Sequence, residues 1–304
     1  MNLKKHNRFR TIFQAICFAF SNGYLNGWVN GKIYTGTAKK ICLPGLNCYS
    51  CPGAVFACPI GSLQAVLGAK GYKFSLYVLG YIGAIGCFFG RAICGWFCPF
   101  GFIQDLLHKI PLFKKIKNLP GHRVLKYLKY VILLVFVILL PMLVTGSTGA
   151  GAPWFCEYIC PDGTLLGGIP LSIANGAVRA AIGWRFYLKM SILVLIVVLS
   201  IKAYRPFCKY ICPLGALYSL ANPISIYRYE VNHDKCVQCG MCQKVCGMDI
   251  KVYETPNSPE CIRCGKCKKA CPKGAIESTF DKMEHKFVKP ETAQTIEPIE
   301  TENS

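Results

Sequence analysis

The chain has 304 residues, of which 53% are hydrophobic and only 16% are charged. This balance is too apolar for an ordinary soluble domain, so it predicts a membrane protein. The net charge of +20 does not indicate a nucleic-acid partner, because the excess Lys and Arg residues lie in loops beside apolar runs and form no single basic face. The 20 cysteines, many spaced by two or three residues, favour metal clusters over a disulfide framework.

Four apolar stretches approach the length of about 20 residues that a membrane-spanning helix needs. They cover residues 11–29, 74–90, 127–144 and 186–204. The first is the weakest, because polar residues interrupt it. Lys and Arg are concentrated in alternate loops, and the rule that cytoplasmic loops hold this excess places both termini on the cytoplasmic side. We therefore expect a mainly α-helical integral membrane protein, with a four-helix transmembrane bundle in residues 1–228.

A cysteine motif, C-x-x-x-C-P-x-G, occurs three times, in residues 94–101, 156–163 and 208–215. A shortened fourth copy occupies residues 58–61. The order of cysteine loop, apolar span and motif occurs twice, which predicts a tandem duplication. Two cysteines separated by three residues can bind one cluster, and Pro and Gly at fixed offsets favour a tight turn that packing alone would not require. Short helices are expected directly after Gly61, Gly101 and Gly215.

The predicted topology divides these cysteines into two groups. The inner group is Cys94, Cys98, Cys208 and Cys212, which is the number of thiolates that a 4Fe-4S cluster requires. The outer group holds six candidates for one further cluster, namely Cys42, Cys48, Cys51, Cys58, Cys156 and Cys160. We favour Cys48, Cys51, Cys156 and Cys160, or the same set with Cys58, and the sequence does not decide between these sets. Structural zinc also takes four cysteines, but a redox-inert ion has little reason to sit symmetrically at both ends of a helical bundle.

Three cations adjoin the inner cysteines in the sequence: Arg91, Arg205 and Lys209. A cluster with four thiolate ligands is anionic, so nearby cations would offset the free-energy cost of holding it near lipid. The alternative interpretation is that their charged ends extend from helix termini to the aqueous interface. The sequence supports both interpretations equally.

Residues 229–280 predict a ferredoxin-like domain of the α+β class, because two runs with the spacing C-x2-C-x2-C-x3-C follow the apolar part of the chain. In such runs the first three cysteines bind one 4Fe-4S cluster and the fourth binds the other. This predicts one set of Cys236, Cys239, Cys242 and Cys271, and a second set of Cys261, Cys264, Cys267 and Cys246. A short strand is expected at residues 250–254. Residues 281–304 are acidic and poor in apolar groups, so they are expected to be disordered.

The order of spans, the C-x-x-x-C-P units and the C-terminal double cluster resemble the membrane polyferredoxins NapH, of periplasmic nitrate reductase systems, and NosR, of nitrous oxide reduction. The resemblance covers residues 48–272. It implies an electron carrier in the cytoplasmic membrane of a prokaryote, with four 4Fe-4S clusters. It also implies a cytoplasmic donor, ferredoxin-like or flavoprotein-like, and an extracytoplasmic redox acceptor such as an FMN-binding protein.

Two other classes of function compete with electron transfer. In one, the protein is a metal reductase or a cofactor-assembly factor, and the outer cysteines Cys58, Cys156 and Cys160 bind copper or iron. In the other, the protein is a redox sensor that signals through loss of a cluster. No catalytic site is identified, and the five histidines are scattered, so the sequence leaves quinone chemistry open. Electron transfer is favoured because clusters are predicted at both faces of short spans.

Overall fold

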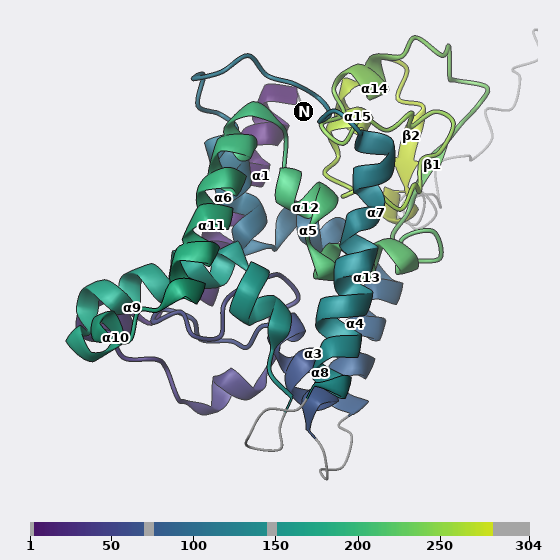
Figure 1. The fold of residues 1–304 in the computed structure, drawn as a ribbon. Helices are drawn as coiled ribbons and strands as arrows, with labels where there is room; N and C mark the ends of the chain where they lie inside the picture. Colours follow the sequence, from purple (N-terminus) through teal and green to yellow (C-terminus); the bar gives the residue numbers. More distant parts are fainter. Residues whose placement is uncertain (1–2, 70–75, 145–150, 282–304) are drawn as a thin grey trace, which may run out of the picture.

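The computed structural model describes residues 3–69, 76–144 and 151–281. These residues are mainly helical, and they contain one pair of short strands in the ferredoxin-like domain (Figure 1). The part of the chain before that domain contains α1 (Leu3–Ser21), α2 (Leu25–Asn30), η1 (Thr37–Lys40), α3 (Pro59–Gly68), α4 (Leu76–Phe89), α5 (Ala92–Trp96), α6 (Pro99–Leu107), α7 (His122–Ile132), η2 (Leu133–Leu139), α8 (Leu140–Leu143), η3 (Phe155–Ile159), η4 (Gly163–Gly168), α9 (Ile169–Ala174), α10 (Gly176–Ala180), α11 (Trp184–Lys202), α12 (Pro206–Tyr210) and α13 (Pro213–Ala221). The ferredoxin-like domain contains β1 (Tyr229–Val231), α14 (Met241–Lys244), α15 (Lys266–Ala270) and β2 (Ile276–Ser278).

Two helices in the described part of the chain are long and apolar enough to cross a membrane. One runs without a break from His122 to Leu143 through α7, η2 and α8, and the other is α11. Only 28% and 22% of their apolar windows are buried inside the protein. Large side chains such as Leu134, Val194 and Leu195 are therefore exposed, as a helix facing hydrocarbon requires. These helices overlap the expected spans at 127–144 and 186–204.

The expected span at 11–29 differs from the observed helix, because α1 begins earlier and ends at Ser21. α1 buries polar side chains at intervals of four residues, namely His6, Arg10 and Gln14. Its exposed face carries the apolar residues Phe9, Ile12, Ile16 and Phe20. The polar face of α1 thus packs on protein and its apolar face points outward, which is the reverse of an amphipathic helix on a soluble protein.

The expected span at 74–90 corresponds to α4, whose 14 residues fall short of the roughly 20 needed to cross a bilayer. The first two residues of that span lie outside the described residues. A four-helix transmembrane bundle is therefore not confirmed, since two helices of sufficient length are present in the described ranges.

The Cys-Pro pairs of the repeated motif start helices. Cys58, Cys98 and Cys212 each occupy the N-cap position of the next helix, and the following Pro lies in its first turn. Pro is favoured there because its fixed φ suits a helix and because its missing N–H would have no partner within the helix. The short helices expected after three of the motif glycines are confirmed as α3, α6 and α13. In the third copy, Cys160 ends η3 and helical structure resumes at Pro161.

The ferredoxin-like domain is closed by the segments that flank its two cysteine runs. β1 and β2 pair in antiparallel register, with Tyr229 opposite Ser278. The strand expected at residues 250–254 is wrong, because these residues form a turn in which the N–H of Thr255 donates to the carbonyl of Lys251 at 2.9 Å. The apolar residues of this turn are buried beneath the loops instead of pairing with a strand. Except for Asp281, the expected disordered tail lies outside the described residues.

The ferredoxin-like domain and the start of α1 lie at one end of the molecule, and α3, α8, α9 and α10 lie at the opposite end (Figure 1). The helices α4, α7 and α11 run between these ends. α5 and α12, which carry Cys94 and Cys208, lie closer to the ferredoxin-like domain than α3, which Cys58 caps. The inner and outer cysteine groups therefore lie at different levels of the helical part.

Candidate iron–sulfur sites

The inner cysteines come together from two pairs of helices. Cys94 lies in α5 and Cys208 in α12, while Cys98 and Cys212 cap α6 and α13. Each has no more than 6% of its surface exposed. Every pair among the four lies close enough for their thiolate charges to repel one another. The structure thus brings together the cysteines that the sequence grouped, and their binding of a cluster stays a prediction.

In the two inner copies of the motif, the glycine amide is directed at the cysteine that precedes Pro. The N–H of Gly101 donates to Sγ of Cys98 at 3.4 Å, and the N–H of Gly215 donates to Sγ of Cys212 at 3.3 Å. An N–H donor at the positive end of a helix stabilises a thiolate. The C-P-x-G spacing therefore places a hydrogen-bond donor at the cysteine sulfur, in addition to forming the expected turn.

Arg91 and Arg205 occupy equivalent places, each three residues before the first cysteine of an inner motif. Arg91 donates to the backbone carbonyl of Cys208 at 2.9 Å, and Arg205 donates to that of Cys94. Each arginine thus contacts the cysteine of the other copy. Both side chains are fully buried. Both arginines therefore lie beside the inner cysteines instead of extending to the protein surface, and their role in offsetting the charge of a cluster stays a prediction.

Asp105 supplies the counter-charge at Arg205. Its two oxygens accept from Nε and Nη2 of Arg205 at 2.7 and 2.6 Å, and Oδ2 also accepts from Arg10 at 2.8 Å. Burial alone would raise the pKa of Asp105, but Arg205 and Arg10 outweigh burial and hold this pKa well below its usual range. A carboxylate on α6 thereby fixes one cation of the inner site.

Lys209 is also buried, but it bonds elsewhere. Its Nζ donates to the carbonyl of Lys117 at 3.2 Å and to Oδ1 of Asn118 at 2.5 Å. Both partners lie in the loop that precedes α7. Lys209 therefore holds this loop against α12. We had considered Lys209 as a cation beside the inner cysteines, and its hydrogen bonds are made to the loop instead.

At the opposite end of the helical part, four cysteines line one cavity of about 550 Å³. They are Cys48, Cys58, Cys156 and Cys160. Their thiols lie near enough to influence one another electrostatically. The shortened motif has Ala54 where the other copies have their first cysteine, and Cys48 from the preceding loop supplies the fourth thiol.

The remaining two outer candidates do not line this cavity. Cys42 donates to the hydroxyl of Ser62 at 3.7 Å, and Cys51 donates to Oδ1 of Asn22 at 3.5 Å. The structure thus gathers Cys58, and not Cys51, around this cavity with Cys48, Cys156 and Cys160, and the binding of a cluster by these four cysteines stays a prediction.

Asp162 is a buried carboxylate that lines the same cavity. It stands at the variable position of C-P-x-G, where the other copies have Ile60, Phe100 and Leu214. Burial raises the pKa of Asp162 to about 8. The backbone of Cys48 favours the ionised form, yet neither carboxylate oxygen completes a hydrogen bond within the described part of the chain. The cavity therefore presents four thiols and one carboxylate without a hydrogen-bond partner.

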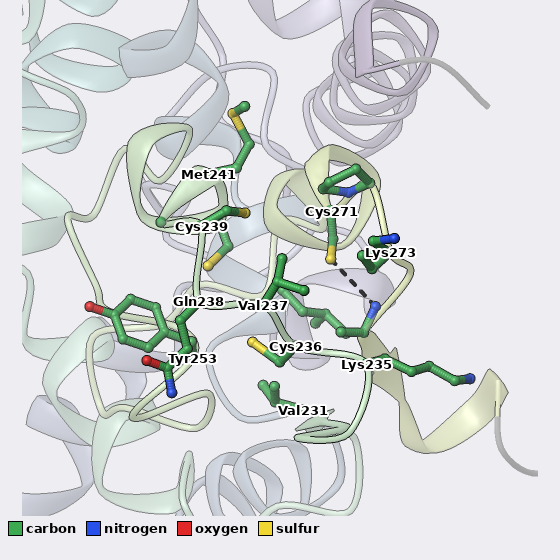
Figure 2. A pocket seen from close by; sticks show the side chains of 15 residues that line it. Val231, Lys235, Cys236, Val237, Gln238, Cys239, Met241, Tyr253, Cys271 and Lys273 are labelled. Carbon is green, nitrogen blue, oxygen red and sulfur yellow. Dashed lines mark hydrogen bonds between the residues drawn. The ribbon is translucent and has the colours of Figure 1, made fainter.

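In the ferredoxin-like domain, Cys236, Cys239, Cys242 and Cys271 surround a single pocket, and we call them the distal set. Figure 2 shows Cys236, Cys239 and Cys271 around this pocket, with Val231 and Tyr253 beside them. The N–H of Ala275 donates to Sγ of Cys271 at 3.4 Å. The rim carries exposed Val237 and Met241, so the distal set lies close to the surface.

The second ferredoxin group, called the proximal set, consists of Cys246, Cys261, Cys264 and Cys267. All of its thiols lie within electrostatic range of one another. Its loop packs on the inner site: Trp96 Nε1 donates to the carbonyl of Arg263 at 3.1 Å, and Asn222 Nδ2 donates to the carbonyl of Cys261 at 3.1 Å. Trp96 lies between the inner cysteines Cys94 and Cys98 in the chain, so the proximal set and the inner group are neighbours.

An ionic contact reinforces this junction. Glu260, which precedes Cys261, accepts from Arg91 at 2.8 Å and from Lys129 at 2.5 Å. Both cations are fully buried. Burial alone would raise the pKa of Glu260, but Arg91 and Lys129 outweigh burial and lower it. Arg91 thus connects the proximal loop to the carbonyl of Cys208 in the inner site.

These sets have the donors that 4Fe-4S clusters require. Burial raises the pKa of Cys48, Cys58 and Cys156 to about 12, so these thiols are protonated without a cluster and would release protons on binding one. Within the described ranges, no three His, Cys, Asp or Glu side chains are grouped as the ligands of a single metal ion are. The thiolates of a 4Fe-4S cluster each bind a different iron, so they lie around a shared space.

Three polar residues at these sites were missed by the sequence analysis: Asp162, Gln64 and Gln104. A signal for the glutamines is present, because each stands six residues after the cysteine that precedes Pro in its copy. A signal for Asp162 is also present, since it is the one charged residue at the variable position of the four motif copies.

Comparison with known proteins agrees with this chemistry. Residues 74–120, 130–169 and 187–225 match a 4Fe-4S binding domain family, and residues 256–277 match a second 4Fe-4S binding domain family. Each of the first three segments contains one complete C-x-x-x-C-P-x-G copy. The expected iron–sulfur binding domains are thereby confirmed, and the expected resemblance to NosR agrees with a relative of that name.

Relatives of this chain include an uncharacterized protein of Methanocaldococcus jannaschii, 34% identical over 54% of this chain and 62% of the relative. The regulatory protein NosR of Pseudomonas aeruginosa is 26% identical over 52% of this chain and 20% of its own length. The putative electron transport protein YccM of Escherichia coli is 27% identical over 53% of this chain and 43% of its own length. The chain thus matches only part of each relative. No solved structure matches it significantly.

Proposed function

We propose that this chain, which contains 4Fe-4S binding domain matches and is similar in part to NosR and YccM, carries electrons between a cytoplasmic donor and an extracytoplasmic acceptor. The proposed order of sites is the distal set, the proximal set, the inner cysteines and the outer cysteines. A 4Fe-4S cluster supplies one-electron redox chemistry when bound. The protein holds the four sites in this order and buries the inner cysteines away from water.

The observation that carries this proposal is the contact between the proximal loop and the inner cysteines. Three residues that flank the inner site donate hydrogen bonds to backbone carbonyls of that loop: Trp96, Asn222 and Arg91. The distal set is the one with an exposed rim, so it is the natural entry point for a soluble donor. The two ferredoxin sets therefore have different roles, which their similar spacing in the sequence does not reveal.

The membrane placement is part of the proposal. Two long apolar helices run between the level of the ferredoxin-like domain and the level of the outer cavity (Figure 1). We place the distal, proximal and inner sets toward the cytoplasm, as the distribution of Lys and Arg favours, and the outer cysteines toward the far side. The external acceptor is then a redox protein, such as a flavoprotein, that docks near α9 and α10.

Iron content tests the proposal. The whole chain, purified anaerobically in detergent, is expected to contain about 16 iron atoms and as many acid-labile sulfides, because four clusters carry four irons each. Colorimetric iron and sulfide assays against quantitative amino-acid analysis measure this ratio. A value near 8 would contradict the proposal, since it would mean that only the ferredoxin-like domain is loaded.

A second candidate function, reduction of a metal ion at the outer site, is favoured by Asp162. A buried carboxylate without a partner, in a cavity that also holds thiols, provides a place for a cation beside a cluster. In this function the electrons that reach the outer site leave on iron or copper instead of on a protein acceptor.

If the second candidate is correct, Asp162→Asn should weaken binding of Fe²⁺ to the cluster-loaded protein by about tenfold or more, because the cation loses its one charged oxygen ligand. Anaerobic equilibrium dialysis measures this binding. Asp234→Asn, at an exposed position of the ferredoxin-like domain, is the matched control and should bind as the wild type does. Equal Fe²⁺ binding by both variants would leave electron transfer to a protein as the supported function.

A further inference from the structure

Gln64 on α3 contacts a cysteine of another motif copy at the outer site. Its Nε2 donates to Sγ of Cys156 at 3.2 Å and to the carbonyl of Ile60 at 3.3 Å. Its Oε1 accepts from the backbone N–H of Phe155 at 3.0 Å. The side chain is fully buried.

Gln104 on α6 makes the same three bonds at the inner site. Its Nε2 donates to Sγ of Cys208 at 3.1 Å and to the carbonyl of Phe100 at 3.4 Å, and its Oε1 accepts from the N–H of Phe207 at 3.2 Å. It has 1% of its surface exposed. Gln64 and Gln104 both follow the capping cysteine of their copy by six residues. The same hydrogen-bonding arrangement therefore occurs at the outer and the inner site.

The orientation of each amide is fixed by its surroundings. A backbone N–H can only donate, so the atom of Gln64 facing Phe155 must be oxygen, and the atom facing Cys156 must be the NH₂ group. The same argument holds for Gln104. Each NH₂ group has two hydrogens, and the sulfur and a carbonyl of the same helix accept one each. The glutamine therefore presents a donor to the sulfur and cannot turn round without leaving a buried N–H unpaired.

The other two copies lack this donor. Leu166 and Tyr218 stand six residues after Cys160 and Cys212. Each site thus receives one glutamine, always from the copy earlier in the chain and always directed at the first cysteine of the later copy. At the inner site the cysteines before Pro already receive the glycine N–H of their own motif, so Gln104 supplies a donor to a different sulfur there.

We propose that Gln64 and Gln104 raise the reduction potentials of the outer and inner clusters, respectively, by donating an N–H···S bond to a ligand cysteine. This inference rests on the proposed function, in which these cysteines hold clusters. Adding one electron increases the negative charge that the ligand sulfurs carry, so a fixed donor stabilises the reduced form more than the oxidised form. Both glutamines are positioning residues for the electron path: they take up no electron themselves.

The test is a redox titration of the detergent-purified protein, followed by electron paramagnetic resonance of the reduced clusters. Gln64→Glu keeps the length of the side chain and an oxygen for the N–H of Phe155, but replaces the donor at Cys156 by an oxygen. At a fixed potential, the ratio of reduced to oxidised outer cluster should fall about tenfold. For a one-electron couple this is a downward shift of about 59 mV.

Gln104→Glu is the matched variant and should lower the inner potential alone, so each variant controls for the other. The two ferredoxin clusters should not move in either variant. Gln64→Met and Gln104→Met remove the donor without adding an acidic group, and a downward shift of the same cluster is expected from each.

The outcomes separate this inference from the proposed function. Wild-type protein without signals from the inner and outer clusters would refute the proposed function before any variant is made. Four clusters in the wild type, with unchanged potentials in all four variants, would refute only the role of the glutamines. Loss of cluster iron in both the Glu and the Met variants would also refute it, because it would show a role in folding or assembly instead of in the potential.

Discussion

Cys160→Ala is expected to abolish electron transfer from a reduced cytoplasmic-side donor to an acceptor on the far side of the membrane. Cys160 is a buried cysteine and one of the four whose thiols line the outer cavity, and a cluster left with three ligands there would be lost or labile. Iron should fall from about 16 to about 12 atoms per chain. The measurement uses proteoliposomes that contain a membrane-impermeant acceptor dye, with donor added outside and the orientation of the protein determined by protease access.

Cys51→Ala is the matched control for this experiment. Cys51 is as deeply buried as Cys160 and lies in the same end of the molecule, but its thiol turns to Asn22 and does not line the outer cavity. This variant should keep the full iron content and the full rate. Undiminished electron transfer in Cys160→Ala would contradict the proposed path, and an equal loss in Cys51→Ala would show that the outer set has been assigned incorrectly.

The sequence predicted the inner group of cysteines from the order of spans and motif copies, and the structure brings these four cysteines together. The three complete motif copies and the two ferredoxin runs fix which thiols are close along the chain. The choice between Cys51 and Cys58 could not be predicted, since it depends on where a loop without regular structure turns. That loop directs Cys51 toward Asn22 of the segment after α1, and no local sequence pattern predicts this contact.

The first apolar stretch shows why length and hydropathy alone mislead. The sequence indicated a weak span at 11–29, yet the helix that forms is defined by polar residues on its buried face. Arg10 pairs with Asp105 on α6, and Gln14 donates to the carbonyl of Gly95 beside the inner cysteines. A spacing of four residues between His6, Arg10 and Gln14 was visible in the sequence. Its meaning needed the partners, which are 81 to 258 residues away in the chain.

The symmetry of the inner site was likewise hidden. Arg91 and Arg205 were recognised as neighbours of cysteines in the chain, but their reciprocal bonds to the cysteine carbonyls of the opposite copy appear only in the folded protein. The glutamines follow the same rule, because Gln104 contacts Cys208 and not the cysteines of its own copy. In this duplicated fold, each copy supplies polar groups to the other copy's cysteines, so spacing within one copy cannot predict them.

Glu260→Gln is expected to destabilise the junction between the ferredoxin-like domain and the inner site by about 3–5 kcal/mol. Its carboxylate is the shared partner of Arg91 and Lys129, and both cations are fully buried. Neutralising Glu260 leaves two buried positive charges without their anion, which costs far more than the loss of a surface ion pair. Chemical denaturation in detergent measures the stability, and the rate of inner-cluster reduction by the ferredoxin clusters measures the functional coupling, which should fall with it.

Acid should reveal the same interaction. The pKa of Glu260 lies below its ordinary value of 4.5 in the folded protein, so its pairing contributes stability above that ordinary value and loses it as the pH falls through the lowered pKa. The wild type should therefore lose stability in this acid range, and Glu260→Gln should lose less, because it has no carboxylate to protonate there.

Two further variants identify the cause of the Glu260 effect. Glu254→Gln removes an equally large carboxylate that pairs with Lys251 at 3.1 Å on the exposed surface of the same domain, so it should change stability and coupling little. Adding Lys129→Met to Glu260→Gln removes one of the two unpaired cations and should restore part of the lost stability. An effect of Glu260→Gln no larger than that of Glu254→Gln would show that the buried cations do not depend on this carboxylate. The junction would then be held by the hydrogen bonds of Trp96 and Asn222.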